Sequence, residues 1–141
     1  MKKLFVLVTV IMLVMVGCGS KPTLSKWVDS DEVVAAEELS NAELADGGLG
    51  LSVKFSADGE DILVLDYIYE QYQNLTGRNQ SEIDAAYADE LNLLGMSTNI
   101  VPIFEECEEA TGITLKCIRV RFVNADGTVI YSQDYVNTHL S

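Results

Sequence analysis

Two short stretches of the chain, KFSADG at residues 54–59 and RFVNADG at residues 121–127, follow the same pattern. Each has a basic residue and a Phe ahead of Ala-Asp-Gly, and an Asp-Gly turn between alternating hydrophobic residues is typical of a β-hairpin. Each hairpin also follows a helical pattern, and Gly59 and Gly127 are 68 positions apart. The sequence therefore predicts an α+β fold with an αββ-αββ repeat, in which a four-stranded antiparallel sheet carries the helices on one face.

Helix and strand signals along the chain agree with this repeat. The first helix is expected over residues 30–45, because the acids within residues 29–32 suit the positive end of a helix. A second helix begins at Ser81 and is expected to break between Gly95 and Pro102, where its apolar stripe changes phase. Strands are expected over residues 51–56, 62–69, 113–123 and 128–136.

The N-terminal segment has the three parts of a secretory signal. Lys2 and Lys3 are followed by a run of 13 mostly apolar residues, Leu4–Val16, and then by Gly17 and Cys18. A bilayer-spanning helix needs about 20 apolar residues, so this run is too short for a permanent span. The Val16-Gly17-Cys18 ending resembles the lipobox of bacterial lipoproteins.

This ending predicts residues 1–17 as a lipoprotein signal peptide and Cys18 as the first residue of the mature chain, lipidated with palmitate. Residues 18–26 would then form a short lipidated tether, and residues 27–141 a single α+β domain. The expected location is extracellular, at the outer face of the cytoplasmic membrane, with the lipid on Cys18 as the membrane anchor.

The charge of the mature chain excludes one class of partner. The full chain has 22 acidic and 9 basic residues, and two of the bases, Lys2 and Lys3, lie in the signal segment, so the mature chain has a net charge of −15. Phosphate groups repel such a chain, and nucleic acid is therefore not an expected partner. The expected partners are the membrane, through Cys18, and an unknown protein or glycan.

Three of the seven basic residues of the mature chain are predicted to share one sheet face. Alignment of the two hairpins puts both Phe residues on the helix-facing side and Lys54, Arg119 and Arg121 on the opposite side. One interpretation is a binding face for an anion or an acidic partner. The other is that these bases pair with neighbouring acids such as Asp66 and Asp134.

Cys107 and Cys117 are the cysteines that remain when Cys18 is assigned to the lipid. In the oxidising compartment of an exported protein they are candidates for a disulfide. The alternative is a pair of buried thiols that act as small apolar residues. Their spacing in the sequence fits both interpretations.

Two other groups of residues have an unusual composition. Glu105, Glu106, Glu108 and Glu109 surround Cys107 near a helix C-terminus, where acids oppose the helix dipole, although a solvated outer face explains most such runs. Several tyrosines fall on strands, where they form either a binding surface on the open sheet face or the margin of a small core. These strand tyrosines are Tyr67, Tyr69, Tyr131 and Tyr135.

Residues for a catalytic or metal site are scarce in the sequence. The only histidine, His139, lies at the C-terminus, where chains fray, so no catalytic triad is expected. Clustered Cys and His residues for zinc are lacking, and no acidic stretch has the spacing of an EF-hand loop. The sequence therefore predicts no catalytic residue, no metal site and no cofactor.

Three features of the sequence together resemble one known family. They are the lipobox, the helix-opening stretch WVDSDE at residues 27–32 and the closing stretch NADGTVIYS at residues 124–132. It is a family of small uncharacterised lipoproteins of Gram-positive bacteria, known only as a domain of unknown function. The resemblance extends over essentially the whole mature chain. It implies a lipid-anchored exported protein and no catalytic residue, since the family offers none.

These observations predict a membrane-anchored extracytoplasmic lipoprotein that acts as a non-catalytic binding or interaction module, and not as an enzyme. One alternative is a cell-wall enzyme that uses paired carboxylates about 5–9 Å apart. Another is an accessory subunit of a transporter, although 124 mature residues are few for solute capture by this chain alone.

Overall fold

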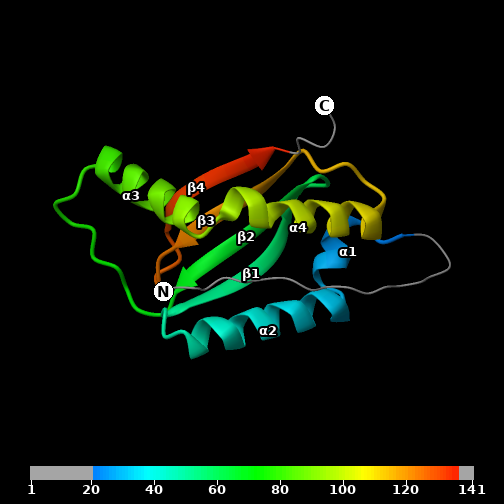
Figure 1. The fold of residues 1–141 in the computed structure, drawn as a ribbon, viewed down its shortest axis with the longest axis horizontal. Coiled ribbons are helices and arrows are strands. Elements are labelled where there is room, and N and C mark those ends of the chain that lie inside the picture. The colour runs from blue at the N-terminus through cyan, green and yellow to red at the C-terminus, as the bar shows by residue number, and fades with distance from the viewer. Residues whose placement is uncertain (1–20, 137–141) are drawn as a thin grey trace.

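The computed structural model describes residues 21–136 of the chain. The sheet has the strand order β1-β2-β3-β4, with α4 crossing one face of it and α2 lying beside β1 (Figure 1). The signal segment, Cys18 and His139 lie outside the described residues. In chain order, the elements are α1 (Leu24–Val28), α2 (Asp31–Asp46), β1 (Leu51–Asp58), β2 (Ile62–Tyr69), α3 (Gln80–Leu93), α4 (Met96–Thr111), β3 (Cys117–Val123) and β4 (Val129–Val136).

The α+β class with a four-stranded sheet is confirmed, but the expectation of a purely antiparallel sheet is wrong. β1–β2 and β3–β4 are antiparallel hairpins, whereas β2 and β3 run parallel, with Ile62 opposite Cys117 and Ile68 opposite Val123. The connection between β2 and β3 contains both α3 and α4, which return the chain to the end of the sheet where β2 began. Such a crossover joins parallel strands, whereas a tight turn joins antiparallel ones.

One face of the sheet carries the hydrophobic core. Strand side chains alternate between the two faces, and Phe55, Leu65 and Val120 lie opposite one another on the buried face of three adjacent strands. α4 packs over this face with side chains four residues apart, such as Ile100 and Phe104. The other face of the sheet has no helix packed on it among residues 21–136.

α2 is placed differently, because it lies along the outer edge of β1 (Figure 1). Its Asn41 side chain accepts a hydrogen bond from the Val53 N–H (2.6 Å) and donates one to the Val53 carbonyl (3.3 Å). Its Glu37 carboxylate accepts a hydrogen bond from the Phe55 N–H (2.5 Å). The two side chains take the place of a neighbouring strand and satisfy the backbone of an edge. The expectation that all helices pack on one face therefore fails for α2.

The predicted break between two helical pieces is confirmed at Gly95. This residue separates α3 from α4 and has a φ of 67°, a left-handed conformation that favours glycine. Pro102 lies inside α4, exposed to solvent, and does not end the helix. In the part of the chain from residue 21 to residue 136, no helix has the length and apolar character needed to cross a bilayer.

The folded domain begins within the stretch that was expected to be a tether, residues 18–26. Leu24, at the start of α1, is 1% exposed and belongs to the core. Before it, the Lys21 Nζ donates a hydrogen bond to the Glu109 carbonyl (2.9 Å) near the C-terminus of α4, where a cation suits the helix dipole. Residues from Leu24 onward therefore belong to the folded domain, and the tether stays a prediction.

The second hairpin accommodates one residue more than the first. RFVNADG exceeds KFSADG by one residue, and the pairing of β3 with β4 shifts between Phe122 and Val123, as in a β-bulge. The order of elements in the two halves is the same, but β1 and β3 run in opposite directions in the sheet. The αββ-αββ repeat is therefore not confirmed and stays a prediction.

Candidate functional site

The sheet face away from α4 carries a set of charged side chains and is called the charged face below. It consists of Lys54, Asp58, Asp66, Arg119, Arg121 and Asp134. Arg121 lies opposite Asp66 and donates two hydrogen bonds to its carboxylate, from Nε to Oδ1 (2.6 Å) and from Nη2 to Oδ2 (2.8 Å). A bidentate pair of this kind fixes both side chains and uses both carboxylate oxygens.

Arg119 is held by two carboxylates. Its Nε and Nη2 donate hydrogen bonds to Asp134 (2.8 and 3.1 Å), and its Nη1 donates one to Asp58 (3.1 Å). The hydrogen bonds from Arg119 lower the pKa of Asp134. The third base, Lys54, is more exposed, with Nζ 3.9 Å from Glu37 Oε1. Because both guanidinium groups already have carboxylate partners, the geometry favours the ion-pair interpretation of this face over anion binding.

Cys107 and Cys117 are both free and buried, and they lie on different sides of the sheet. Cys107 belongs to the core under α4, where burial raises the pKa of its thiol to about 12. Cys117 precedes the core residue Ile118 on β3 and therefore points to the charged face; burial also raises the pKa of its thiol. A disulfide needs side chains that face one another. The structure therefore favours two separate buried thiols.

The strand tyrosines lie on the helix side of the sheet and not on its open face. The ring centroids of Tyr67 and Tyr69 are 5.8 and 6.4 Å from that of Phe122, and the ring of Tyr87 on α3 is 4.9 Å from it. Tyr131 stacks on Tyr87 at 6.3 Å. These rings extend the hydrophobic core beneath α3, which matches the interpretation of the tyrosines as part of a small core.

Among the acids near the end of α4, Glu108 has a structural role. Its Oε2 accepts a hydrogen bond from the Leu115 N–H (2.9 Å). This bond holds the irregular segment ahead of β3, so the Leu115 N–H is satisfied without strand pairing. β3 accordingly begins at Cys117 and not at residue 113, where the sequence placed it.

We predict that Glu106→Gln stabilises the domain above neutral pH. Burial, followed by the charges of Glu109 and Glu105, raises the pKa of Glu106 from 4.5 to about 7. The folded state therefore holds this proton more tightly than the unfolded state, and the ionised carboxyl costs stability above that pKa. The variant should have a higher melting temperature than the parent at about pH 8, and this difference should vanish as the pH falls below the ordinary pKa of Glu. Glu38→Gln, at an exposed position of α2, is the control. Identical melting curves of parent and Glu106→Gln at the higher pH would contradict the prediction.

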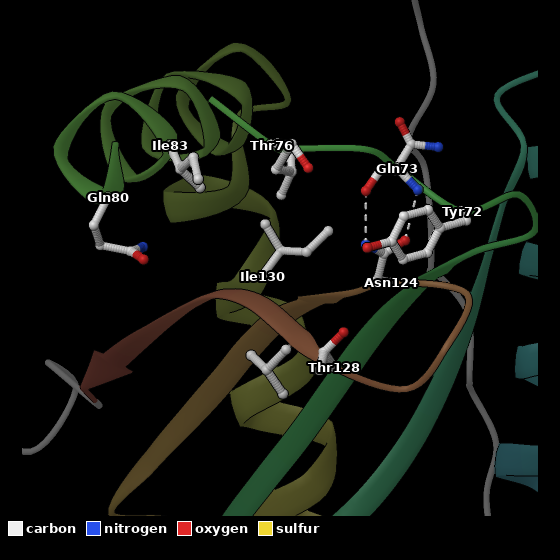
Figure 2. A pocket seen from close by; sticks show the side chains of 10 residues that line it. Tyr72, Gln73, Thr76, Gln80, Ile83, Asn124, Thr128 and Ile130 are labelled. Atoms are coloured by element: carbon white, nitrogen blue, oxygen red, sulfur yellow. Dashed lines mark hydrogen bonds between the residues drawn. The ribbon is translucent and has the colours of Figure 1, made fainter. Parts of the chain in front are cut away.

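A pocket of about 290 Å³ opens at the end of the sheet where β2 finishes and β3 turns into β4 (Figure 2). Three segments build it, namely the loop of residues 70–79, the start of α3 and the β3–β4 hairpin with the start of β4. Figure 2 shows Ile83 on α3 above the opening and Ile130 on β4 below it. The lining residues are Tyr72, Gln73, Leu75, Thr76, Gln80, Ile83, Asn124, Thr128, Val129 and Ile130.

Asn124 holds the loop against the hairpin. It is 4% exposed, and it accepts a hydrogen bond from the Gln73 N–H (2.7 Å) and donates one to the Gln73 carbonyl (2.9 Å), as Figure 2 shows. Its Oδ1 also accepts a hydrogen bond from the Ala125 N–H (2.9 Å). Within the loop, the Thr76 N–H donates to Asn74 Oδ1 (3.0 Å). These bonds fix the wall of the pocket before any ligand arrives, which lowers the ordering cost of binding.

The chemical character of the pocket is neutral and amphipathic. None of the ten described lining residues is charged, although acids and bases make up 22% of the chain. Three of the ten have amide side chains, three have hydroxyl groups and four are aliphatic. Tyr72 presents its ring at the opening and is 60% exposed. A lining of this kind suits an uncharged ligand that has both apolar surface and hydrogen-bonding groups.

Sequence patterns did not indicate this pocket. Residues 71–80 fit a polar loop and nothing more, although binding residues lie disproportionately on loops held by a rigid scaffold. RFVNADG is one residue longer than KFSADG, and Asn124 lies in the part where the two motifs differ. This difference between the hairpins was the second feature of the sequence that could have pointed toward the pocket.

Neither a metal site nor a carboxylate pair is found with this pocket. Among residues 21–136, no group of three or more His, Cys, Asp or Glu side chains is placed to hold a metal ion. The described lining also includes no Asp or Glu, whereas hydrolysis by paired carboxylates requires two of them beside the substrate.

The fold and the pocket define this protein as an α+β domain with a four-stranded mixed sheet, a helix along one sheet edge and a neutral pocket at one sheet end. The chain belongs to the family described as Domain of unknown function (DUF4854), whose model matches residues 24–135. The expected membership of a domain family of unknown function is thereby confirmed. Comparisons with curated proteins and with solved structures find no significant match.

Proposed function

We propose that this chain is a lipid-anchored extracytoplasmic module that binds a neutral glycan in the end pocket and performs no chemistry on it. The observation that carries the proposal is the uncharged, amphipathic lining of that pocket. The missing carboxylates of the described lining favour binding over the alternative of a cell-wall hydrolase.

A neutral sugar has the two kinds of surface that this lining complements. The C–H face of a sugar ring is apolar and suits Ile83, Ile130 and the exposed ring of Tyr72. Its hydroxyl and acetamido groups can exchange hydrogen bonds with side chains such as Gln73 and Thr76. An anionic ligand finds no cation among the ten lining residues, so charge selects against it.

The place of the pocket in the fold supports presentation to the outside of the cell. Lys21, the first described residue, lies near the C-terminus of α4, which Figure 1 places at the opposite end of the sheet from the loop of residues 70–79. Three residues of chain span at most about 11 Å, so a lipid on Cys18 would hold the end of the domain near Lys21 close to the membrane. The pocket would then face away from the bilayer.

The proposal extends to the two similar hairpins, which would be diverged copies of one αββ unit. Only the second copy has the extra residue in its motif, and with it Asn124, which fixes the loop of the pocket. In this scheme the binding site arose where the two copies differ.

Titration with a neutral glycan tests the proposed function. The full-length protein in detergent micelles is titrated with chitotriose, a neutral oligomer of N-acetylglucosamine, by isothermal calorimetry. Thr76→Trp places a bulky side chain in the pocket and should weaken binding at least roughly tenfold, about 1.4 kcal/mol. Thr98→Trp, at a threonine on α4 that is also exposed, is the matched control and should bind like the parent.

Three results would contradict this function. Chitotriose that does not bind the parent rules out the assigned ligand class, and chitotriose that binds Thr76→Trp as well as the parent places the ligand elsewhere. Release of smaller sugars from the bound oligomer would show catalysis and support the hydrolase alternative.

A further inference from the structure

The two outer edges of the sheet differ in how their backbone groups are satisfied. At the β1 edge, Asn41 and Glu37 of α2 bond the outward N–H and C=O groups of Val53 and the outward N–H of Phe55. At the β4 edge, no side chain among residues 21–136 has a comparable bond to the strand backbone. An edge strand with free N–H and C=O groups is a template for another strand, unless it is protected.

The register of the sheet shows which groups of β4 face outward. Along a strand, the backbone N–H and C=O groups of successive residues point alternately to one neighbour and to the other. Val53 and Phe55 direct these groups away from β2, and the paired residues carry this alternation across all four strands. It places Val120 opposite Gln133 as a hydrogen-bonded pair, so the N–H and C=O groups of Ser132 and Asp134 point to the outer edge.

β4 has one device that protects an edge, the bulge opposite Val123, but it lies at the start of the strand and leaves residues 131–136 regularly paired. The strand has eight residues without Pro or Lys, and its one charged residue, Asp134, is paired with Arg119 at 2.8 Å. Val129 and Val136, at its two ends, are 47% and 66% exposed. Charged side chains and Pro are what keep edge strands from pairing, so β4 is open to strand addition.

The charge next to β4 selects the kind of strand that fits. α3 lies beside β4, as the stacking of Tyr87 on Tyr131 shows. α3 carries four exposed acids, Glu82, Asp84, Asp89 and Glu90, and no base. Asp84 is close enough to Tyr131 of β4 to act on it electrostatically, whereas Glu90 acts on Tyr69 of β2 and lies on the side away from the β4 edge. The side chains of an added strand alternate between the two faces, so every second one would lie on the side of α3.

We propose that the outer edge of β4 accepts an extended basic segment of another protein as a fifth strand. Main-chain hydrogen bonds to Ser132 and Asp134 hold the segment, and Lys or Arg at alternate positions meets the acids on the β4 side of α3, Asp84 among them. The surface at Ser132 and Asp134 adjoins the pocket, whose lining includes Val129 and Ile130 of the same strand, but it does not depend on the glycan proposal. A second copy of this acidic chain is disfavoured on the same edge, because like charges would meet.

Fluorescence anisotropy with a labelled peptide tests this inference. The probe is a nine-residue peptide in which Lys alternates with Thr and Val, and the control peptide has Glu in place of each Lys. The full-length protein in detergent micelles should bind the Lys peptide, with an affinity that falls as salt rises, and should not bind the Glu peptide.

Variants of the edge and of α3 locate the site. Ser132→Pro removes an outward N–H and should weaken binding of the Lys peptide at least roughly tenfold, whereas Ser132→Ala keeps the backbone and should bind like the parent. The double variant Asp84→Asn with Asp89→Asn leaves β4 intact and should reduce both the affinity and its salt dependence, which tests the inference even if the Pro variant misfolds. Thr76→Trp should bind the peptide normally, which separates this surface from the pocket.

Three results would overturn the inference. The first is equal binding of the Lys peptide by parent and by a folded Ser132→Pro. The second is equal binding of the Lys and Glu peptides. The third is a dimer of the parent in sedimentation that Ser132→Pro dissociates, since a second copy would then occupy the edge.

Discussion

Cys18→Ser is expected to abolish lipid incorporation and to leave the full-length precursor with residues 1–17 still attached. The lipid is expected on the sulfur of Cys18, and a serine hydroxyl is a far weaker nucleophile than a thiolate. Without acyl chains, each CH₂ of which contributes about 0.8 kcal/mol when buried in the bilayer, the anchor of the mature domain is lost. Metabolic labelling with a palmitate analogue and the mass of the N-terminal peptide measure both effects.

Cys117→Ser is the matched control for Cys18→Ser. It also removes one thiol, but this thiol is buried at the start of β3, so processing and label should stay as in the parent. Normal membrane retention of a mature chain whose N-terminal peptide has no acyl mass would refute lipidation at Cys18. Such a result would not contradict the proposals for the pocket and the β4 edge, because both lie within residues 21–136.

Asn124→Ala is expected to lower the free energy of unfolding by about 2–3 kcal/mol and to abolish glycan binding. The substitution removes hydrogen bonds to the N–H and carbonyl of Gln73 and to the N–H of Ala125. Because Asn124 is 4% exposed, these backbone groups are left largely without water. Urea denaturation measures the stability, and calorimetry with chitotriose measures the binding.

Asn124→Asp separates the two directions of hydrogen bonding. The carboxylate still accepts from the Gln73 N–H but no longer donates to the Gln73 carbonyl, so the stability should lie between those of parent and Asn124→Ala. Asn92→Ala, at an exposed position of α3, should change the stability by less than about 0.5 kcal/mol. A loss for Asn124→Ala no larger than that for Asn92→Ala would show that the loop is held by other contacts.

The helices and strands were predictable because their signals are local. The acids of residues 29–32 mark the start of α2, the alternation of Leu51, Val53 and Phe55 marks β1, and Gly95 marks the break between α3 and α4. Each of these signals depends on neighbours within a few positions. The direction of β3 does not, because it depends on how α3 and α4 return the chain to the sheet.

The candidate site was less predictable, because it depends on which segments meet in space. The sequence grouped Lys54, Arg119 and Arg121 by alternation and offered Asp66 and Asp134 as their partners, but it did not indicate that Asp58 also binds Arg119. The sequence also predicted residues 71–80 as a loop, but it did not indicate that Gln73 of this loop is hydrogen-bonded to Asn124, 51 positions further along the chain. The position of α2 at an edge was equally hidden, because Glu37 and Asn41 look like ordinary surface residues of an amphipathic helix.

The parallel pairing of β2 with β3 also determines the order in which the sheet can assemble. Each pair across it joins residues 55 positions apart, from Ile62 with Cys117 to Ile68 with Val123, whereas each hairpin closes over a short turn. Distant pairs form late, because the chain between them must be ordered first. A chain that emerges N-terminus first can therefore complete β1, β2 and α2 early, with β1 already covered. The inner side of β2 then stays open to other strands until residues 117–123 arrive, and this interval is when the chain is most exposed to misassembly.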